Sequence, residues 1–404
     1  MQENAIAPVK SAERINELDM IRGVALLGIL MVNMALFKSP FMDLRLPSQY
    51  PEGIERVSAY FIQLFFTGNF YAIFSFLFGI GFFIFMERTI QKGLELKPLY
   101  RRRLFALMVF GLIHLIIFWS GDILFNYALV GFILLAFRDK PLQSIKKWII
   151  SLFILSFILN MIMIVFKGIG EIIGDEKYHA VVDQMLAETI LKYTEAGFVE
   201  LLLFRLANEV PYIFFGVVFW IPQVLAFFLC GLYVGKKGIF KDIPSHITLF
   251  KKIRLWGFLV GGLLLVLLVL FDSGAITNNT LVNLAMLSGI NYLASLFLFP
   301  AYVSTIVLAA QSATWNKILS PVASAGKMAL TNYLSQTLIC VIIFYGFGFG
   351  LYGQLTIYHG ILLTVAIFLL QVFWSTIWMK KFRFGPMEWV WRNITYKKRF
   401  PISR

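Results

Sequence analysis

The sequence is poor in charged residues, in cysteine and in histidine. Charged residues make up 14% of its 404 residues, whereas soluble globular proteins carry about a quarter. Its two cysteines, Cys230 and Cys340, lie in apolar runs and show neither a disulfide framework nor metal-ligand spacing. Its four histidines include no metal-binding pair. The composition therefore argues against a large soluble core, and no metal site is predicted.

Familiar catalytic and targeting signals are missing as well. No glycine-rich phosphate loop precedes a predicted helix, and no nucleophile elbow occurs. The net charge of +14 comes from short basic patches between apolar segments that match no nucleic-acid-binding motif, so no nucleic-acid partner is expected. A long polar tail precedes the first apolar run at Leu18, and no small-residue cleavage site follows it. The first run is therefore predicted to stay in the protein as a membrane span.

Long apolar runs dominate the sequence, which is 59% apolar with a mean hydropathy of +0.78. A helix that crosses a bilayer needs roughly 20 predominantly apolar residues. Ten stretches approach this length: 20–37, 69–86, 104–119, 123–137, 148–166, 212–234, 255–271, 284–309, 325–345 and 357–379. Two shorter apolar stretches, 58–66 and 198–206, are predicted as interfacial helices. The sequence thus predicts an all-α membrane protein with about ten transmembrane helices.

Basic residues indicate how the chain is oriented, because positively charged loops stay on the cytoplasmic side. If the N-terminus is inside, most lysines and arginines fall on inside connections and on the C-terminal tail. We therefore expect a cytoplasmic tail at 1–18, a single transmembrane domain at 19–379 and a basic cytoplasmic tail at 380–404. The acidic outside loop at about 167–205 is predicted either as a solvated loop or as a lid over an external cavity.

The start of the first span, LDMIRGVALLGILMVN, contains the first group of candidate site residues. Asp19 lies one turn before Arg22, close enough to pair with it. Asn33 follows eleven positions after Arg22, which returns it to nearly the same helix face after a rise of about 16 Å. Ionisable groups within a membrane usually face water or the bundle interior. We therefore expect Arg22 and Asn33 to line a polar cavity, whereas Asp19 is equally well explained as a helix cap.

The segment HLIIFWSGDILFNYA contains the second group. Its third and fourth predicted spans are joined only by the residues SGD, which predicts a tight hairpin. His114 lies in the third span, Asp122 precedes the fourth, and Asn126 follows one turn later. A carboxylate beside a histidine raises its basicity and fixes its tautomer. His114 and Asp122 are therefore candidate catalytic residues and Asn126 a candidate binding residue; an interhelical hydrogen bond and a turn cap are the alternatives for the pair.

Two later segments contain the remaining candidates. In GKMALTNYLSQT, Asn332 and Gln336 share a helix face, with Tyr333 alongside, and all three are candidate substrate-binding residues. In FGPMEWVWRNITY, the two tryptophans and Arg392 predict a short helix that lies in the membrane interface as an anchor.

These segments together resemble the YeiB-like family of bacterial membrane proteins, the domain of unknown function 418. The resemblance extends over nearly the whole chain, and its last block, FRFGPMEWVWR, is quite specific. The family is similar, more distantly, to transmembrane acyltransferases such as the lysosomal heparan-alpha-glucosaminide N-acetyltransferase and the bacterial sugar O-acyltransferases. The resemblance implies that an acyl group from cytoplasmic acetyl-CoA or another acyl-CoA reaches an acceptor on the other side of the membrane.

The resemblance also implies roles for the candidate residues. Arg22 would hold the anionic donor, and Asn33 would line the route outward. The sugar O-acyltransferases place a histidine where this chain has Asn33, and the lysosomal enzyme has one in the loop after its first helix, where residues 38–57 of this chain contain none. The expected base is therefore His114, assisted by Asp122.

The partners implied are the lipid bilayer, an acyl-CoA, a sugar, lipid or small-molecule acceptor, and a second copy of the chain in a homodimer. The expected location is the bacterial plasma membrane. A transporter or flippase of a small or amphipathic molecule is the main alternative, because buried polar stripes and proline-containing spans suit it equally. A non-catalytic scaffold is the third interpretation.

Overall fold

The computed structural model describes residues 14–40, 45–174, 176–277 and 279–404, and within them the fold is helical. The main helices are α1 (Asn16–Lys38), α2 (Ile54–Phe65), α3 (Phe70–Gln91), α4 (Leu96–Ile113), α5 (Leu124–Leu134), α6 (Leu142–Ile173), α7 (Glu176–Glu195), α8 (Phe198–Asn208), α9 (Val210–Lys236), α10 (Ile247–Asp272), α11 (Thr280–Ala310), α12 (Ala313–Lys327), α13 (Ala329–Phe344), α14 (Ile357–Lys381) and α15 (Pro386–Tyr396). A π-helical turn, His114–Phe118, continues α4.

The helices have the lengths and composition of a multi-pass membrane protein, as predicted. Seven helical stretches in the described chain are long and apolar enough to cross a membrane, or eight if α12 and α13 form one bent span. Nine of the ten predicted spans correspond to a single helical stretch and the ninth is divided between α12 and α13; α4 and α5, which form the predicted hairpin, fall short of these criteria. The predicted interfacial stretches 58–66 and 198–206 correspond to α2 and α8.

The ninth predicted span is the main correction to the sequence-based prediction. We expected one helix over 325–345, but the chain breaks at Met328, where α12 and α13 meet at a bend of 80°. Gly326 and Lys327 precede this break, but apolar residues resume at Met328, so hydropathy alone did not indicate that one helix ends there. The bend is supported from elsewhere in the chain, because a side chain of α15 caps the first backbone N–H groups of α13.

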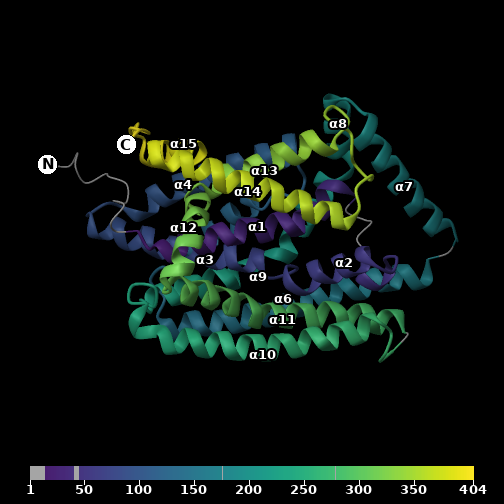
Figure 1. Cartoon of the computed structure of the whole chain (residues 1–404), viewed down its shortest axis with the longest axis horizontal. Helices are drawn as coiled ribbons and strands as arrows, with labels where there is room; N and C mark the ends of the chain where they lie inside the picture. Colours follow the sequence, from purple (N-terminus) through teal and green to yellow (C-terminus); the bar gives the residue numbers. More distant parts are fainter. Residues whose placement is uncertain (1–13, 41–44, 175, 278) are drawn as a thin grey trace.

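Helix α1 runs through the middle of the bundle (Figure 1), where it packs against α3, α11, α12, α13 and α14. Helices α6, α10 and α11 form one side of the molecule, and α13 and α14 lie across α1 from them. The start of α1 and all of α15 lie at one end of the bundle, and α7 and α8 lie at the other. Glycines permit the closest helix pairs: a Cβ on Gly326 of α12 would lie 1.9 Å from the Asp19 carbonyl oxygen of α1.

Candidate functional site

A cavity of about 820 Å³ opens at the end of the bundle where α1 begins. It lies between the starts of α1 and α4, the ends of α3 and α9, the α12–α13 break and α15. Eight cationic side chains and three carboxylates line it. The cationic residues are Arg14, Arg22, Arg88, Lys92, Arg103, Lys241, Lys327 and Arg392, and the acidic ones are Asp19, Glu87 and Glu388. The mouth is therefore strongly positive.

The inner part of the same cavity is apolar. Ile29 lines it seven residues after Arg22 on α1, about 10 Å further along the helix axis. Phe74 and Leu77 line it from the middle of α3, and Tyr127 and Tyr333 from α5 and α13. The cavity therefore has a cationic mouth and an apolar, partly aromatic inner wall. Such a shape suits an elongated anionic molecule with an apolar portion.

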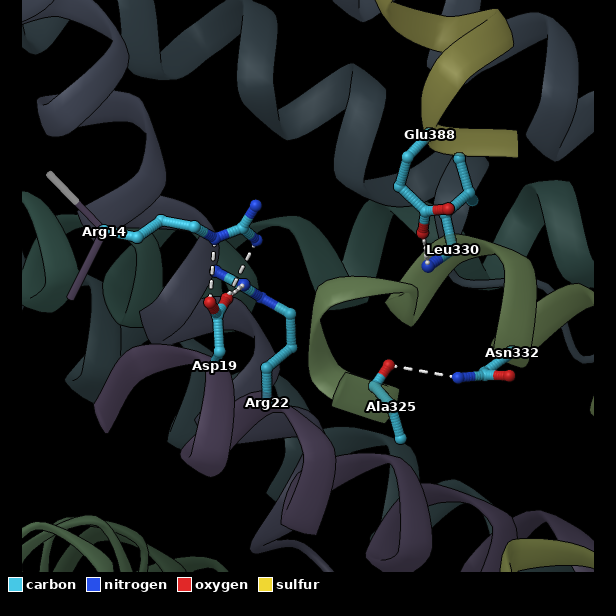
Figure 2. A network of polar contacts seen from close by, with 7 residues as sticks. All are labelled: Arg14, Asp19, Arg22, Ala325, Leu330, Asn332 and Glu388. Carbon is cyan, nitrogen blue, oxygen red and sulfur yellow. Dashed lines mark hydrogen bonds and ion pairs between the residues drawn. The ribbon is translucent and has the colours of Figure 1, made fainter. Parts of the chain in front are cut away.

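Asp19 organises the positive charge at the mouth (Figure 2). Arg22 donates to Asp19 Oδ1 at 2.7 Å, which confirms the predicted pairing, and Arg14 donates to both carboxylate oxygens at 2.8 and 3.1 Å. The Asp19 side chain is 3% exposed, whereas that of Arg22 is 26% exposed and lines the cavity. One carboxylate thus serves two guanidinium groups, which leaves net positive charge facing the cavity. Sequence reasoning missed Arg14, because it lies in the polar tail before the first span.

Glu388 of α15 caps the start of α13 beside these arginines. Its Oε1 accepts from the backbone N–H groups of Leu330 and Thr331 at 2.7 and 3.1 Å, and its Oε2 accepts from the Thr331 hydroxyl at 2.6 Å. Burial raises the pKa of Glu388 above its ordinary value, although the hydrogen bonds from Thr331 act in the opposite direction. A carboxylate at a helix N-terminus satisfies N–H groups that lack an intrahelical partner. Sequence reasoning assigned no role to Glu388.

The rest of α15 packs on α4 at the cavity mouth. The Arg103 guanidinium carbon lies 3.7 Å from the Trp391 ring centre, and the Trp391 indole N–H donates to the Arg103 carbonyl oxygen at 2.8 Å. Burial, with repulsion from Arg103 and Arg14, lowers the pKa of Arg392 to about 10, so Arg392 stays cationic at neutral pH. The helix predicted as a membrane anchor therefore also forms part of the cavity wall.

His114 begins the π-helical turn and forms the centre of a buried hydrogen-bonded chain. Its Nδ1 lies 2.8 Å from Asp122 Oδ1, and its Nε2 lies 2.9 Å from the Thr337 hydroxyl. The backbone N–H of Phe125 donates to Asp122 Oδ2 at 2.6 Å. The structure thus brings together His114 and Asp122, the two candidate catalytic residues. It adds Thr337, which sequence reasoning missed because a threonine in an apolar helix carries no distinguishing signal.

Tyr333 separates this chain of hydrogen bonds from the cavity. Its side chain lines the cavity, and its ring centre lies 5.2 Å from the centre of the His114 ring. His114, Asp122 and Thr337 are buried and do not themselves line the cavity. The candidate base therefore lies directly behind the inner wall of the cavity, and Tyr333 covers it.

The π-helical turn that holds His114 is supported from the opposite end of the bundle. The Trp119 N–H donates to the His114 carbonyl oxygen at 2.9 Å, as the wider turn requires. The Arg205 side chain of α8, which is 2% exposed, donates to the Leu115 carbonyl oxygen at 2.7 Å. Such turns often occur at functional sites. The loop predicted at about 167–205 thus contributes a buried residue that fixes the backbone next to His114.

Comparison with known proteins identifies the family. A family described as "Protein of unknown function (DUF418)" matches residues 234–398. The uncharacterized protein YxaH of Bacillus subtilis is 32% identical over 99% of both chains. The chain belongs to the YeiB-like DUF418 family. The uncharacterized protein YeiB of Escherichia coli is 30% identical over 96% of this chain and 98% of its own. An uncharacterized 39.9 kDa protein of Bacillus acidopullulyticus is 30% identical over 98% and 97%.

The remaining candidates of this DUF418 chain lie outside the cavity. Asn332 and Gln336 face α14 instead: Asn332 Nδ2 donates to Ser375 Oγ at 2.9 Å, and Gln336 Nε2 donates to Gln371 Oε1 at 2.9 Å. Gln371 Nε2 returns a bond to the Asn332 carbonyl oxygen at 2.8 Å. This network is buried and well satisfied, so it clamps α13 to α14.

Asn33 and Asn126 are half-buried and line no part of the cavity. Ile29 is the last α1 residue in its wall, and Asn33 lies one turn further along the helix. The Asn126 side-chain oxygen has no hydrogen-bond partner in the described part of the chain. No group of three or more His, Cys, Asp and Glu side chains among the described residues is arranged to hold a metal ion.

Proposed function

We propose that this protein is a membrane acyltransferase that takes an acyl group from an acyl-CoA in the cavity and passes it to an acceptor on the other side of the membrane. One observation carries the proposal. A carboxylate–imidazole–hydroxyl chain, formed by Asp122, His114 and Thr337, lies against the inner end of a cavity with a cationic mouth.

The cavity matches the chemistry of the donor. Coenzyme A carries phosphate groups at one end, and arginine binds phosphate through charge-assisted, often bidentate hydrogen bonds. Arg22, Arg103 and Arg392 approach the mouth from three different helices, α1, α4 and α15. The apolar inner wall would accept the pantetheine arm and the acyl chain, which points the thioester toward Tyr333.

The buried chain of hydrogen bonds matches the chemistry of transfer. An ionised Asp122 accepts the Nδ1 proton of His114, so the neutral imidazole keeps Nε2 free to accept a proton. A general base in this position contributes typically about 10²–10⁴-fold to the rate. The Tyr333 ring must move aside before substrate reaches His114, because it covers the imidazole on the cavity side.

The proposed setting is the plasma membrane of a bacterium, with both termini in the cytoplasm. The cationic mouth then faces the cytoplasm, where acyl-CoA is found, in agreement with the distribution of positive charge among the loops. Relatives over the full length occur in Bacillus subtilis and Escherichia coli. The acceptor would approach from the end of the bundle that carries α7 and α8.

The direct test measures thioester consumption by the purified protein in lipid nanodiscs. Acyl-CoAs of graded chain length are supplied with membrane extract as the source of acceptor, and release of free coenzyme A thiol is followed. We expect His114→Ala to abolish release and to leave expression intact. His179→Ala is the matched control, because His179 is exposed on α7. Full activity of His114→Ala would remove the assigned base.

A transporter or flippase is the second candidate, and the 80° break between α12 and α13 beside the cavity favours it. Broken helices form substrate sites in many transporters. A transporter would move an anionic amphiphile across a proteoliposome membrane without any loss of thioester. Flux that is unchanged in His114→Ala would support this candidate over the enzyme.

A further inference from the structure

Thr337 differs from the other buried threonines in the helices of this chain. A threonine within a helix usually donates its hydroxyl to the backbone carbonyl one turn earlier. Thr89 donates in this way to Phe85 at 2.7 Å, and Thr364 donates to Gly360 at 2.8 Å. The Thr337 hydroxyl instead lies 2.9 Å from His114 Nε2 on a different helical segment. It is the group from which His114 would take a proton.

We infer that Thr337 is the nucleophile and that it carries the acyl group as an ester between donor and acceptor. This inference rests on the proposed function and deepens it. A nucleophile, a base within hydrogen-bond reach and a third group that orients the base are the three parts of an activated hydroxyl. Thr337, His114 and Asp122 occupy these positions at 2.9 and 2.8 Å.

The first half of the reaction transfers the acyl group to the protein. The Thr337 oxygen attacks the thioester carbonyl carbon while His114 Nε2 takes the hydroxyl proton. The carbon–sulfur bond then breaks, and the thiolate of coenzyme A leaves with the proton that His114 returns. The products are an acyl-threonine ester and free coenzyme A thiol.

The second half releases the group to the acceptor. The acceptor hydroxyl or amine gives a proton to His114 Nε2 and attacks the ester carbonyl carbon. The bond to the Thr337 oxygen breaks, and this oxygen takes the proton back from His114. Donor and acceptor therefore never need to occupy the site together, which suits two substrates that arrive from opposite sides of a membrane.

Tyr333 lies one turn before Thr337 on the same face of α13 and covers the cavity side of His114. Its side chain is buried, at 6% exposed, and its hydroxyl faces the backbone of Ile123. Rotation of Tyr333 therefore breaks only this contact with Ile123, whose geometry falls outside that of a normal hydrogen bond. Once it has turned away from Ile123, the Tyr333 hydroxyl on the inner cavity wall is also able to donate to the thioester carbonyl oxygen.

The test uses the full-length protein in nanodiscs with an acyl-CoA that carries a radiolabelled acyl group. The protein is incubated without acceptor, denatured and analysed for covalently bound label and for the mass of one acyl group. Thr337→Val removes the hydroxyl and keeps the shape of the side chain, whereas Thr337→Ser keeps the hydroxyl. Thr364→Val is the matched control, because Thr364 is an equally buried helical threonine on α14.

We expect labelled wild type, Thr337→Ser and Thr364→Val, and no label on Thr337→Val. Thr337→Val should also consume thioester at least about 100-fold more slowly than Thr364→Val. Double-reciprocal plots of the initial rates of the wild type, at several acceptor concentrations, should show the parallel lines of a ping-pong mechanism. Thioester consumption by Thr337→Val at the wild-type rate would overturn this inference and leave the proposed function standing. Intersecting lines in the double-reciprocal plots of the wild type, together with no label on the wild-type protein, would also overturn it. That outcome does not depend on whether a variant folds. A wild type that consumes no thioester would overturn both.

Discussion

Asp122→Asn separates the catalytic role of Asp122 from its structural role. Both oxygens of Asp122 accept, one from His114 Nδ1 at 2.8 Å and one from the Phe125 backbone N–H at 2.6 Å. Asparagine offers one accepting oxygen and one donating amide group. The oxygen must stay with Phe125, because an amide group there would place donor against donor. The amide group therefore faces His114 Nδ1, which then has to accept.

This reversal moves the imidazole proton to Nε2, where it is donated to Thr337. His114 keeps two hydrogen bonds but can no longer take a proton from Thr337 or from an acceptor. Because two hydrogen bonds reverse direction but neither is lost, the stability loss should be small, about 1–2 kcal/mol. The loss of base catalysis should be large, about 10²–10⁴-fold in the rate of thioester consumption.

The assay pairs initial rates of thiol release with thermal unfolding of the same nanodisc samples. Asp272→Asn is the matched control, because Asp272 is another buried aspartate that accepts two bonds from Ser48, at 3.0 and 2.9 Å, far along the chain from His114. It should lose a similar amount of stability and keep its rate. An Asp122→Asn protein that turns over at the wild-type rate would refute the reasoning and leave His114 a purely structural residue.

Three further predictions concern the framework of the site. In a thermal unfolding assay, Gly326→Ala should destabilise the protein by about 1–3 kcal/mol, because its Cβ would lie 1.9 Å from the Asp19 carbonyl oxygen. The control is Gly262→Ala, whose Cβ would meet nothing within 4 Å and which should leave the stability unchanged. Gln371→Leu should lower the free energy of unfolding by about 2 kcal/mol, since it leaves several buried polar groups of the α13–α14 clamp without partners, and an unchanged unfolding temperature would contradict that role. Glu388→Gln tests the raised pKa of Glu388. Because the folded protein binds the carboxyl proton of Glu388 more tightly than the unfolded chain does, protonation stabilises the folded state. This stabilisation is present below the unfolded pKa and is lost as pH rises through the raised folded pKa. Unfolding temperatures measured across this window should therefore fall for the wild type relative to the variant, and a relative rise would show that the pKa is lowered instead.

The membrane helices could be predicted from the sequence because length and apolarity alone define a span. The bend at Met328 could not. Gly326 and Lys327 precede the break and no proline lies at it, and its support comes from Glu388, about sixty residues later in the chain. A break that depends on a distant cap cannot be predicted from local hydropathy alone.

The candidate site could also be predicted only in part, because the sequence indicates contacts between residues that are close along the chain and not those between distant helices. Asp19 and Arg22 lie within one turn, and His114 and Asp122 flank one hairpin, so local geometry brings each pair together. Thr337 meets His114 only because α13 packs against the π-helical turn. The cavity wall formed by α15 was also missed, because two tryptophans and an arginine predict an interfacial helix whether or not it also borders a cavity.

The most direct test of the proposed donor site is an electron cryomicroscopy structure of the protein in nanodiscs with saturating coenzyme A. We expect density in the cavity, with the phosphates between Arg22 and Arg392 and the thiol end next to Tyr333. A cavity that stays empty of coenzyme, or that holds only lipid acyl chains at saturating ligand, would contradict the proposal that this protein uses acyl-CoA.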